Sequence, residues 1–394
     1  HADRLIDFGP QPPSNRYESP KSPSPDRHPL IVGQCGECGL MQLIDPMPPA
    51  MAMSRFEWLT YNEPEGHLDD LVTRLSKTPG ISKASRIAGL TYKDDTTLAR
   101  FQRLGYTNVY RYDPDADLGL DDLCAGLESI QAAMDAAAAA RLADRHGLAD
   151  ILLVRHVLEH AHDPIAFLRA VGALVKPGGR IVFEMPDSRR FIEACDYSFV
   201  WEEHIVYLCS RTLARLVGAA GFTLAQTLVY PYPLEDSLIG IVANTPSGES
   251  RNRAPEEVDA LLAEGRRFAT RYPELRQHLH RLLGGWQRAG RRVAVFGAGH
   301  LAARFVNLFD LAALVACVID DNPHKQGVLM PGSRLPIRGS GLLAAGDVDI
   351  CLMALSPESE QKVRAKNQAF VEHGGRFLSV FAQSPQSIYS ASAT

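Results

Sequence analysis

The sequence lacks the features that would place the protein in a membrane or on a nucleic acid. No apolar run approaches the roughly 20 residues that span a bilayer. Positive charge is not in excess, because the net charge is -5 at pH 7, so neither nucleic acid nor a membrane surface is an expected partner. We expect a small-molecule substrate, and the sequence leaves the oligomeric state open.

Cysteine is scarce as well. The seven cysteines are an odd number and mostly scattered, which argues against a disulfide scaffold and favours a reducing compartment, by default the cytoplasm. The sequence starts at His1 without a methionine or an apolar signal segment, so we expect a trimmed or processed chain.

The length and the periodic pattern predict the fold class. At 394 residues the chain is too long for one ordinary core. Short apolar runs alternate with helical patterns from about 81 to 245 and again after 291, which is typical of βαβ units. We expect an α/β protein with two Rossmann-like, doubly wound domains, a helical linker and a small zinc-knuckle-like module at the N-terminus. The expected regions are the module at 1–55, the first α/β domain at 56–245, the linker at 246–290 and the second α/β domain at 291–394.

Individual elements follow from the same pattern. Residues 10–29 carry many prolines and can only be loop or extended chain. The alanine run in 128–146 predicts one helix, because alanine has the highest helical propensity. Lys176-Pro177-Gly178-Gly179 is expected to close a helix over 164–175. The strands expected in the first domain lie at 85–90, 108–112, 149–155 and 180–184, and one or two linker helices lie at 254–288.

The segment from Val200 to Tyr207 carries the strongest chemical signal. It contains Glu202, Glu203 and His204 in an aromatic setting, just beyond a predicted parallel strand. The carboxyl ends of such strands are where α/β enzymes tend to keep a general base, and a carboxylate beside an imidazole raises its basicity and fixes its tautomer. The alternative is an amphipathic segment whose Glu and His face solvent.

Two other motifs leave alternatives open. Cys35 and Cys38 form a C-x-x-C-G turn, which is half of a tetrahedral zinc site, a reduced structural pair or a redox pair. No second C-x-x-C exists, and His1 and His28 are the other candidate ligands. Gly297-x-Gly299-x-x-Ala302, with an acidic pair about 20 residues later, matches a dinucleotide fingerprint. The same glycines also suit a tight turn in a domain without that ligand.

The turns of the first domain suggest a nucleotide cofactor. Gly89 lies in the first strand–helix turn, where an S-adenosylmethionine site usually has several glycines. Asp113 ends the second strand and either binds ribose hydroxyls or is a turn residue before proline. His156 belongs to a loop with three His and two acids whose spacing does not copy a zincin helix, so contact with cofactor or substrate is favoured over a metal site.

Together these segments resemble the sugar C-methyltransferases that act on nucleotide-linked 4-keto-deoxyhexoses, and the likeness covers nearly the whole chain. The resemblance implies an N-terminal zinc module, a class I methyltransferase domain that binds S-adenosylmethionine, and a Rossmann-like C-terminal domain that frames the sugar-nucleotide cleft. The stretches that carry it are 5–16, 32–43, 155–160, 202–204 and 320–327, with Pro331-Gly332 and Leu335-Pro336-Ile337.

The resemblance also implies roles for residues. His204 is the expected base and Glu203 its partner, in an acid–Glu–His motif that starts at Glu202. The other residues expected at the site are Gly89, Asp95, Asp113 and His156 for the cofactor, Trp201, Tyr207, Glu235, Asp236, Gly297 and Gly299 for the substrate, and Cys35 and Cys38 for zinc.

The sequence departs from the family pattern at four places. The family's first C-x-x-C is expected before residue 1, Thr91–Asp95 replaces the glycine-rich turn, Trp201 replaces a tyrosine, and Leu234–Ser237 replaces a His-Gly-Gly-Ser segment. Three functions therefore remain open. The first, which we favour, is an S-adenosylmethionine-dependent C-methyltransferase of a nucleotide-linked keto-deoxysugar or similar polar metabolite. The others are a non-methylating sugar-nucleotide-binding pseudoenzyme and an NAD-dependent oxidoreductase using the Gly297-Gly299-Ala302 turn.

Overall fold

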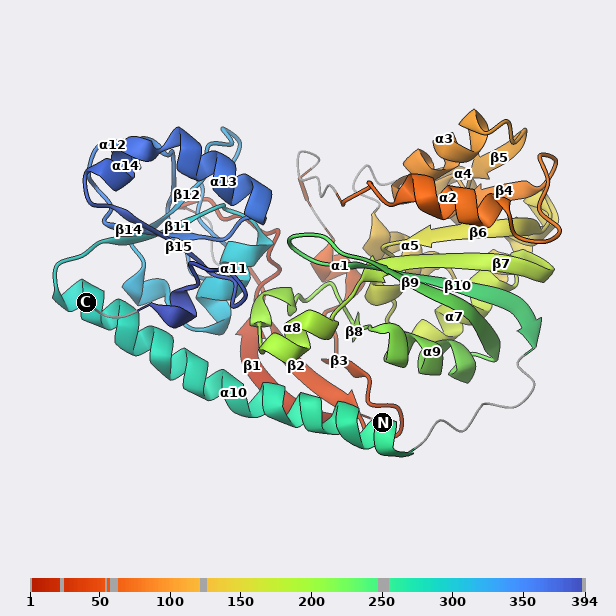
Figure 1. Ribbon diagram of the computed structural model, residues 1–394, viewed down its shortest axis with the longest axis horizontal. Helices are drawn as coiled ribbons and strands as arrows, with labels where there is room; N and C mark the ends of the chain where they lie inside the picture. Colours follow the sequence, from red (N-terminus) through yellow and green to blue (C-terminus); the bar gives the residue numbers. More distant parts are fainter. Residues whose placement is uncertain are drawn as a thin grey trace.

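Three β-sheets and one long helix organise the protein (Figure 1). The computed structural model describes residues 2–21, 25–53, 55–56, 63–120, 126–246 and 255–391. Two α/β lobes lie side by side, and the N-terminal strands lie below and between them against the long helix (Figure 1). Within the described ranges, no helix is long and apolar enough to cross a membrane.

The N-terminal region forms an antiparallel sheet that the proline-rich sequence did not predict. Its order is β1-β2-β3-β8, with β1 at Ala2–Gln11, β2 at His28–Cys35, β3 at Met41–Ile44 and β8 at Val206–Tyr207. The short helix α1 follows at Pro49–Ala52. Its fourth strand comes from the segment that carries His204, so this region is built together with the first α/β domain rather than apart from it.

The first α/β domain is built on a six-stranded sheet of order β5-β4-β6-β7-β10-β9. The first four strands are parallel, and β10 is antiparallel to both of its neighbours. The strands are β4 Arg86–Gly89, β5 Asn108–Arg111, β6 Ala149–Arg155, β7 Val175–Pro186, β9 Phe222–Tyr230 and β10 Ser237–Pro246. The three strands predicted at 85–90, 108–112 and 149–155 are therefore confirmed.

Two predicted element boundaries are wrong. Lys176-Pro177-Gly178-Gly179 does not close a helix but lies inside β7, which starts at Val175. The helix predicted over 128–146 is two helices, α5 Leu127–Ala133 and α6 Ala136–His146. The break falls at Asp135, whose side chain accepts a hydrogen bond from the Ala138 amide at 2.7 Å and so starts a new helix.

Helices cover both faces of this sheet, as expected for a doubly wound domain. Along β6, Ile151 and Leu153 pack on one side and Leu152 and Val154 on the other, because successive side chains of a strand point to opposite faces. One face carries α2 (Leu68–Ser76) and α3 (Asp95–Arg103), and the other carries α5, α6, α7 (Pro164–Gly172) and α9 (Ser210–Ala219). Two shorter helices are α4 Pro114–Leu118 and α8 Arg189–Ala194.

The C-terminal domain is a five-stranded parallel sheet of order β13-β12-β11-β14-β15. The predicted linker is the single helix α10, Pro255–Arg288. It is also a packing element, since Leu279 and Leu283 share one buried core with β11 and with Phe8 of β1. The remaining elements are β11 Val293–Phe296, β12 Cys317–Ile319, β13 Ile337–Arg338, β14 Ile350–Met353, β15 Arg376–Ser379, α11 His300–Leu308, α12 Gly341–Ala344, α13 Pro357–Lys366 and α14 Gln368–Glu372.

Candidate active site

One cavity of about 440 Å³ lies between the sheets of the two α/β domains, at the carboxyl ends of their parallel strands. Open α/β sheets bind ligands at this edge. Its walls come from the turn after β4, the loops after β6 and β7, the segment 198–204, the β9–β10 turn and the turns after β11, β12 and β14, together with Glu63 and Leu127. The predicted residues that line it are His156, Trp201, Glu203, His204, Glu235, Gly297 and Gly299.

His204 is one of the residues that line this cavity. Its ring meets the His160 ring nearly at right angles, with centroids 4.9 Å apart, and lies 4.9 Å from the Trp201 ring. Burial lowers the pKa of His204 well below its usual value, and His160 and His300 add to the effect. The imidazole is therefore neutral at pH 7 and has a lone pair to accept a proton.

Glu203 also lines the cavity, but it does not orient His204 as predicted. Within the described residues no hydrogen bond joins the two side chains, and the Glu203 carboxyl instead accepts from Asn15 Nδ2 at 3.0 Å. Burial raises the pKa of Glu203 well above its usual value, and Glu128 and Glu202 raise it further. The environment thus favours a neutral carboxylic acid, which can donate a hydrogen bond.

Glu202 has a structural role, so its predicted catalytic role is wrong. Its side chain points away from the cavity and accepts from the backbone amide of Ser14 and, at 3.1 Å, from Arg304 of α11. Both charged side chains are at most 1% exposed. Glu202 therefore ties the N-terminal segment to the C-terminal domain directly behind the active-site segment.

The two aromatic residues of this segment, Trp201 and Tyr207, also differ in whether they line the cavity. Trp201 stacks on His300 with ring centroids 4.4 Å apart and an interplanar angle of 14°, and both residues line the cavity. Tyr207 is buried in β8, and its hydroxyl donates to the Trp201 carbonyl at 3.4 Å. Tyr207 does not line the cavity, so its predicted contact with substrate is wrong.

The turn after β4 is closed by a side chain. The Asp94 carboxylate accepts from the amides of Leu90 and Thr91 at 2.8 and 2.9 Å, and its other oxygen accepts from the Arg155 amide at 3.1 Å. A Cβ added to Gly89 would lie 2.7 Å from Asp94 Cβ. The space beside Gly89 is therefore filled by protein, and Gly89 does not line the cavity.

The two predicted aspartates of the cofactor site also lie outside the cavity. Asp113 is exposed and caps α4 by accepting from the Ala116 amide at 2.8 Å. Asp95 pairs with Arg111 at 2.8 Å. Neither aspartate lines the cavity.

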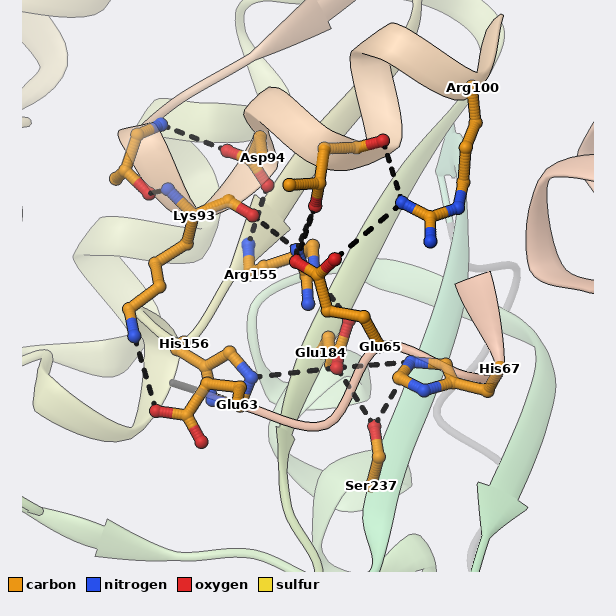
Figure 2. A network of polar contacts seen from close by, with 12 residues as sticks. Glu63, Glu65, His67, Lys93, Asp94, Arg100, Arg155, His156, Glu184 and Ser237 are labelled. Atoms are coloured by element: carbon orange, nitrogen blue, oxygen red, sulfur yellow. Dashed lines mark hydrogen bonds and ion pairs between the residues drawn. The ribbon is translucent and has the colours of Figure 1, made fainter. Parts of the chain in front are cut away.

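His156 does line the cavity, and a buried network holds it (Figure 2). Its backbone has φ +54°, a left-handed conformation that is uncommon outside glycine. Glu159 lies 3.3 Å from Nδ1 and Glu184 lies 3.5 Å from Nε2. Although burial disfavours the charged ring, Glu63, Glu159 and Glu184 raise the pKa of His156 well above its usual value.

Glu184 is the centre of this network (Figure 2). Its carboxylate contacts Arg155 Nε at 2.5 Å, His67 at 3.1 Å and the Ser237 hydroxyl at 3.0 Å. Burial disfavours the charge, but His156, His67 and Arg155 lower the pKa of Glu184 well below its usual value. An ionised Glu184 therefore fixes the end of β6, and with it the loop that carries His156.

The C-terminal wall is formed by the Gly297-Ala298-Gly299 turn and the start of α11. Gly297 has φ +100°, and a Cβ there would lie 2.5 Å from the Leu355 side chain, whereas Gly299 has open space beside it. Asp320, which the fingerprint places on a ribose, accepts instead from the Ala298 amide at 2.9 Å and from Lys325 at 3.2 Å. The turn is therefore stabilised without a dinucleotide.

Leu234–Ser237 replaces the family's histidine segment and contributes one acid to the cavity. Burial, with Glu63 nearby, raises the pKa of Glu235 to about 7. Asp236 does not line the cavity and pairs with Arg190 at 3.1 Å, so its predicted contact with substrate is wrong.

Two places contain possible metal ligands. Donor atoms of Glu159, His160 and His204 lie within 4.8 Å of one another, but His160 Nδ1 is 2.5 Å from Glu128 Oε1, as in a hydrogen-bonded acid–base cluster. Cys35 and Cys38 lie in the β2–β3 turn, where the described residues bring no third ligand close to them. Burial and the neighbouring thiol raise the pKa of Cys38 to about 11.

The other histidines predicted for zinc give no support. His28 lies at the opposite end of β2 from Cys35 and contacts the Asp45 carbonyl at 2.8 Å, so it is not a ligand of this pair. His1 lies outside the described residues.

Comparison with known proteins establishes the class of the protein. Residues 63–227 match the model of a methyltransferase domain, and residues 252–381 match that of a C-methyltransferase C-terminal domain. The chain is 25% identical over 371 residues to the C-methyltransferase NovU of Streptomyces niveus, a match that covers 89% of this chain and 85% of that protein. The chain is therefore a methyltransferase, and its resemblance to the C-methyltransferases is confirmed.

Two solved methyltransferases are similar only at a low level. One is 1,6-didemethyltoxoflavin-N1-methyltransferase from Burkholderia thailandensis with S-adenosylhomocysteine, at 16% identity over 46% of this chain and 79% of that one, with a TM-score of 0.31. The other is magnesium protoporphyrin IX methyltransferase from Synechocystis PCC 6803 with S-adenosylhomocysteine, at 11% identity over 47% and 90%, with a TM-score of 0.28.

Several residues of the cavity were not predicted. Glu159 and His160 lie in the same loop as His156, and the acids and histidines of that loop were a signal that could have found them. Glu63 lies in no motif, and Lys93 and His300 lie in motifs that gave them no role, because their position in the cavity depends on how distant segments meet. The polar residues that the sequence did not reveal include Glu63, Lys93, Glu159, His160, His300 and Lys325.

Proposed function

We propose that the protein is an S-adenosylmethionine-dependent C-methyltransferase that acts on a nucleotide-linked keto-deoxysugar or a similar polar metabolite. The observation that carries this proposal is His204: a neutral, half-buried imidazole that lines a cavity between the two α/β domains. A positioned base with a free lone pair is what removal of a proton beside a keto group requires.

The side chains around His204 suit the two halves of such a reaction. His204 takes the proton from the carbon beside the carbonyl, which leaves the electron pair on an enolate. Glu203, held as a neutral acid, donates a hydrogen bond to the developing oxyanion, since preorganised donors stabilise charge that appears in the transition state. S-adenosylmethionine supplies the methyl group, so a C–C bond forms and a C–S bond breaks.

The cavity also supports a substrate with a polar, ring-shaped part. Trp201 and His300 offer a stacked aromatic wall, and aromatic faces pack well against flat or sugar rings. Gly299 is the N-cap of α11 and lines the cavity, and backbone amides at a helix N-terminus favour the negative charge of a diphosphate. We infer that the nucleotide part lies toward this C-terminal wall.

A second candidate function is a sugar-nucleotide-binding protein that no longer methylates. The observation in its favour is the turn after β4, which Asp94 fills. Calorimetry with S-adenosylhomocysteine, NAD and a dTDP-sugar separates the candidates. The proposal expects binding of the first and the third. Binding of the sugar nucleotide alone would support the second candidate, and binding of NAD would support an oxidoreductase.

The remaining expectations are also proposals. We infer four regions at 1–55, 56–245, 246–290 and 291–394, a cytoplasmic location, and zinc at Cys35 and Cys38. Elemental analysis of protein purified without chelator tests the zinc site. A metal-free sample would leave the two cysteines as an ordinary turn.

A further inference from the structure

We propose that Lys93 and Glu63 bind the amino-acid end of S-adenosylmethionine, Lys93 through its carboxylate and Glu63 through its ammonium group. This inference rests on the proposed function, because it concerns the same cofactor. It names two side chains that take over a task for which the amides of Leu90 and Thr91 are not available.

The first argument is the state of that turn. In it the amides of Leu90 and Thr91 are already bonded to Asp94, at 2.8 and 2.9 Å. A backbone amide has one hydrogen to donate, so neither is available to a ligand carboxylate. A methionyl carboxylate held here therefore cannot use these two amides, and a charged side chain is a strong alternative partner.

The second argument is the position of the pair. Lys93 follows β4 in the 3-10 turn Tyr92–Asp94, and Glu63 precedes α2 on a different segment, yet both line the cavity. Their charged atoms are 3.2 Å apart (Figure 2), and the side chains are only 8% and 21% exposed. An ion pair that faces a cavity offers one positive and one negative group to a ligand.

The third argument is charge balance. The amino-acid end of the cofactor is a zwitterion, with one carboxylate and one ammonium group on the same carbon. Inserted between Lys93 and Glu63, it replaces one ion pair by two and leaves no buried charge without a partner. Removing one partner of a buried ion pair costs free energy, because the other charge then stays buried without a partner. His156, next to Glu63 in the cavity, adds a polar group to this wall.

The pair therefore selects ligands by their amino-acid end. 5′-Methylthioadenosine has the same nucleoside and thioether but neither charge, so it should not depend on Lys93 or Glu63. Decarboxylated S-adenosylmethionine keeps the ammonium group and lacks the carboxylate, so it should depend on Glu63 alone.

The test is calorimetric titration of wild type, Lys93→Met and Glu63→Gln with S-adenosylhomocysteine and 5′-methylthioadenosine. A lost charge-assisted hydrogen bond should lower the affinity for S-adenosylhomocysteine about 10- to 100-fold in each variant and leave that for 5′-methylthioadenosine unchanged. Lys83→Met is the matched control, because it removes the same charge from an exposed lysine that lies over the Tyr106 ring and does not line the cavity.

The outcomes separate this inference from the proposed function. Wild-type binding of S-adenosylhomocysteine that Lys93→Met leaves intact overturns the role of Lys93 only. An equal loss for both ligands in Lys93→Met also overturns it, since that points to a damaged cavity. Failure of wild type to bind either ligand overturns the cofactor assignment itself.

Discussion

Replacing His204 with alanine should abolish removal of the substrate proton while leaving cofactor binding intact. His204 lies between His160 and Trp201 and has no salt bridge among the described residues, so its loss should disturb the fold little. A positioned general base contributes about 10²- to 10⁴-fold to a rate, which corresponds to about 2.7–5.4 kcal/mol of activation free energy. The variant should lose at least this factor in turnover.

The base step can be measured alone. In the absence of a methyl donor, the wild-type enzyme should exchange the hydrogen beside the keto group of a dTDP-keto-deoxysugar for deuterium, and His204→Ala should exchange it at least about 100-fold more slowly. Binding of S-adenosylhomocysteine by calorimetry serves as the folding control. Exchange at an undiminished rate would refute the reasoning and move the base to Glu159, Glu235 or His156.

The pH profile of the same exchange tests the base and the acid together. Because burial lowers the pKa of His204, the base is neutral above that pKa, so the rate should rise with pH in the acidic range and be level near pH 6.5. Because burial raises the pKa of Glu203, the acid is protonated below it, so the rate should fall as pH rises through that value. In Glu203→Gln the fall of the rate at high pH should disappear while the rise at low pH stays, which would assign the fall to Glu203 and the rise to His204. An unchanged profile would exclude Glu203 from the exchange step.

Three further predictions concern stability. Glu202→Gln leaves the buried Arg304 without its charged partner and should lower the free energy of unfolding by about 3–5 kcal/mol. Glu264→Gln, which removes a half-buried partner of Arg211, should lower it by less than about 1 kcal/mol. Equal shifts of the two variants in thermal unfolding would contradict this prediction. Gly297→Ala forces a side chain into a left-handed, crowded position and should cost about 1–3 kcal/mol, while Gly299→Ala, in open extended backbone, should be tolerated in the same assay. Since the pKa of Glu184 is lowered in the folded state, its contribution to stability is present above its ordinary pKa near 4.5 and is lost as pH falls through the lowered value; Glu184→Gln should therefore flatten the acid limb of a denaturation profile.

The parts of the fold that the sequence predicted are those with a strong local pattern. The strand at 149–155 contains the apolar run 151–154, which is buried on both faces, and such runs are typical of central parallel strands. The N-terminal sheet was missed because prolines interrupt its pattern and because one of its strands comes from Val206 and Tyr207. Nothing in the sequence of the first 55 residues indicates that a strand at residues 206–207 pairs with this sheet.

The candidate site shows the same difference between residues that belong to a local sequence pattern and residues that do not. His204 was found because an adjacent acid and histidine beyond a strand form a recognisable pattern. Glu202 was misassigned because neighbours in an irregular segment point in opposite directions, so only one of the two glutamates reaches the cavity. Glu63 was missed, since the cation that it meets comes near only after distant segments pack together. Asp94 was missed although its signal is local, because Thr91 and Asp94 form a capping box.

The pairing of β8 with β3 bears on how the active site comes into being during synthesis. Tyr207 lies opposite Met41, and Val206 opposite Gln42, so strands made early must wait for a partner made some 165 residues later. Contacts of such long sequence separation form slowly. On the ribosome the edge of β3 stays exposed over that interval, which makes it a point where newly made chains can associate wrongly. A fragment limited to residues 63–227 would carry His204 next to a strand with nothing to pair with.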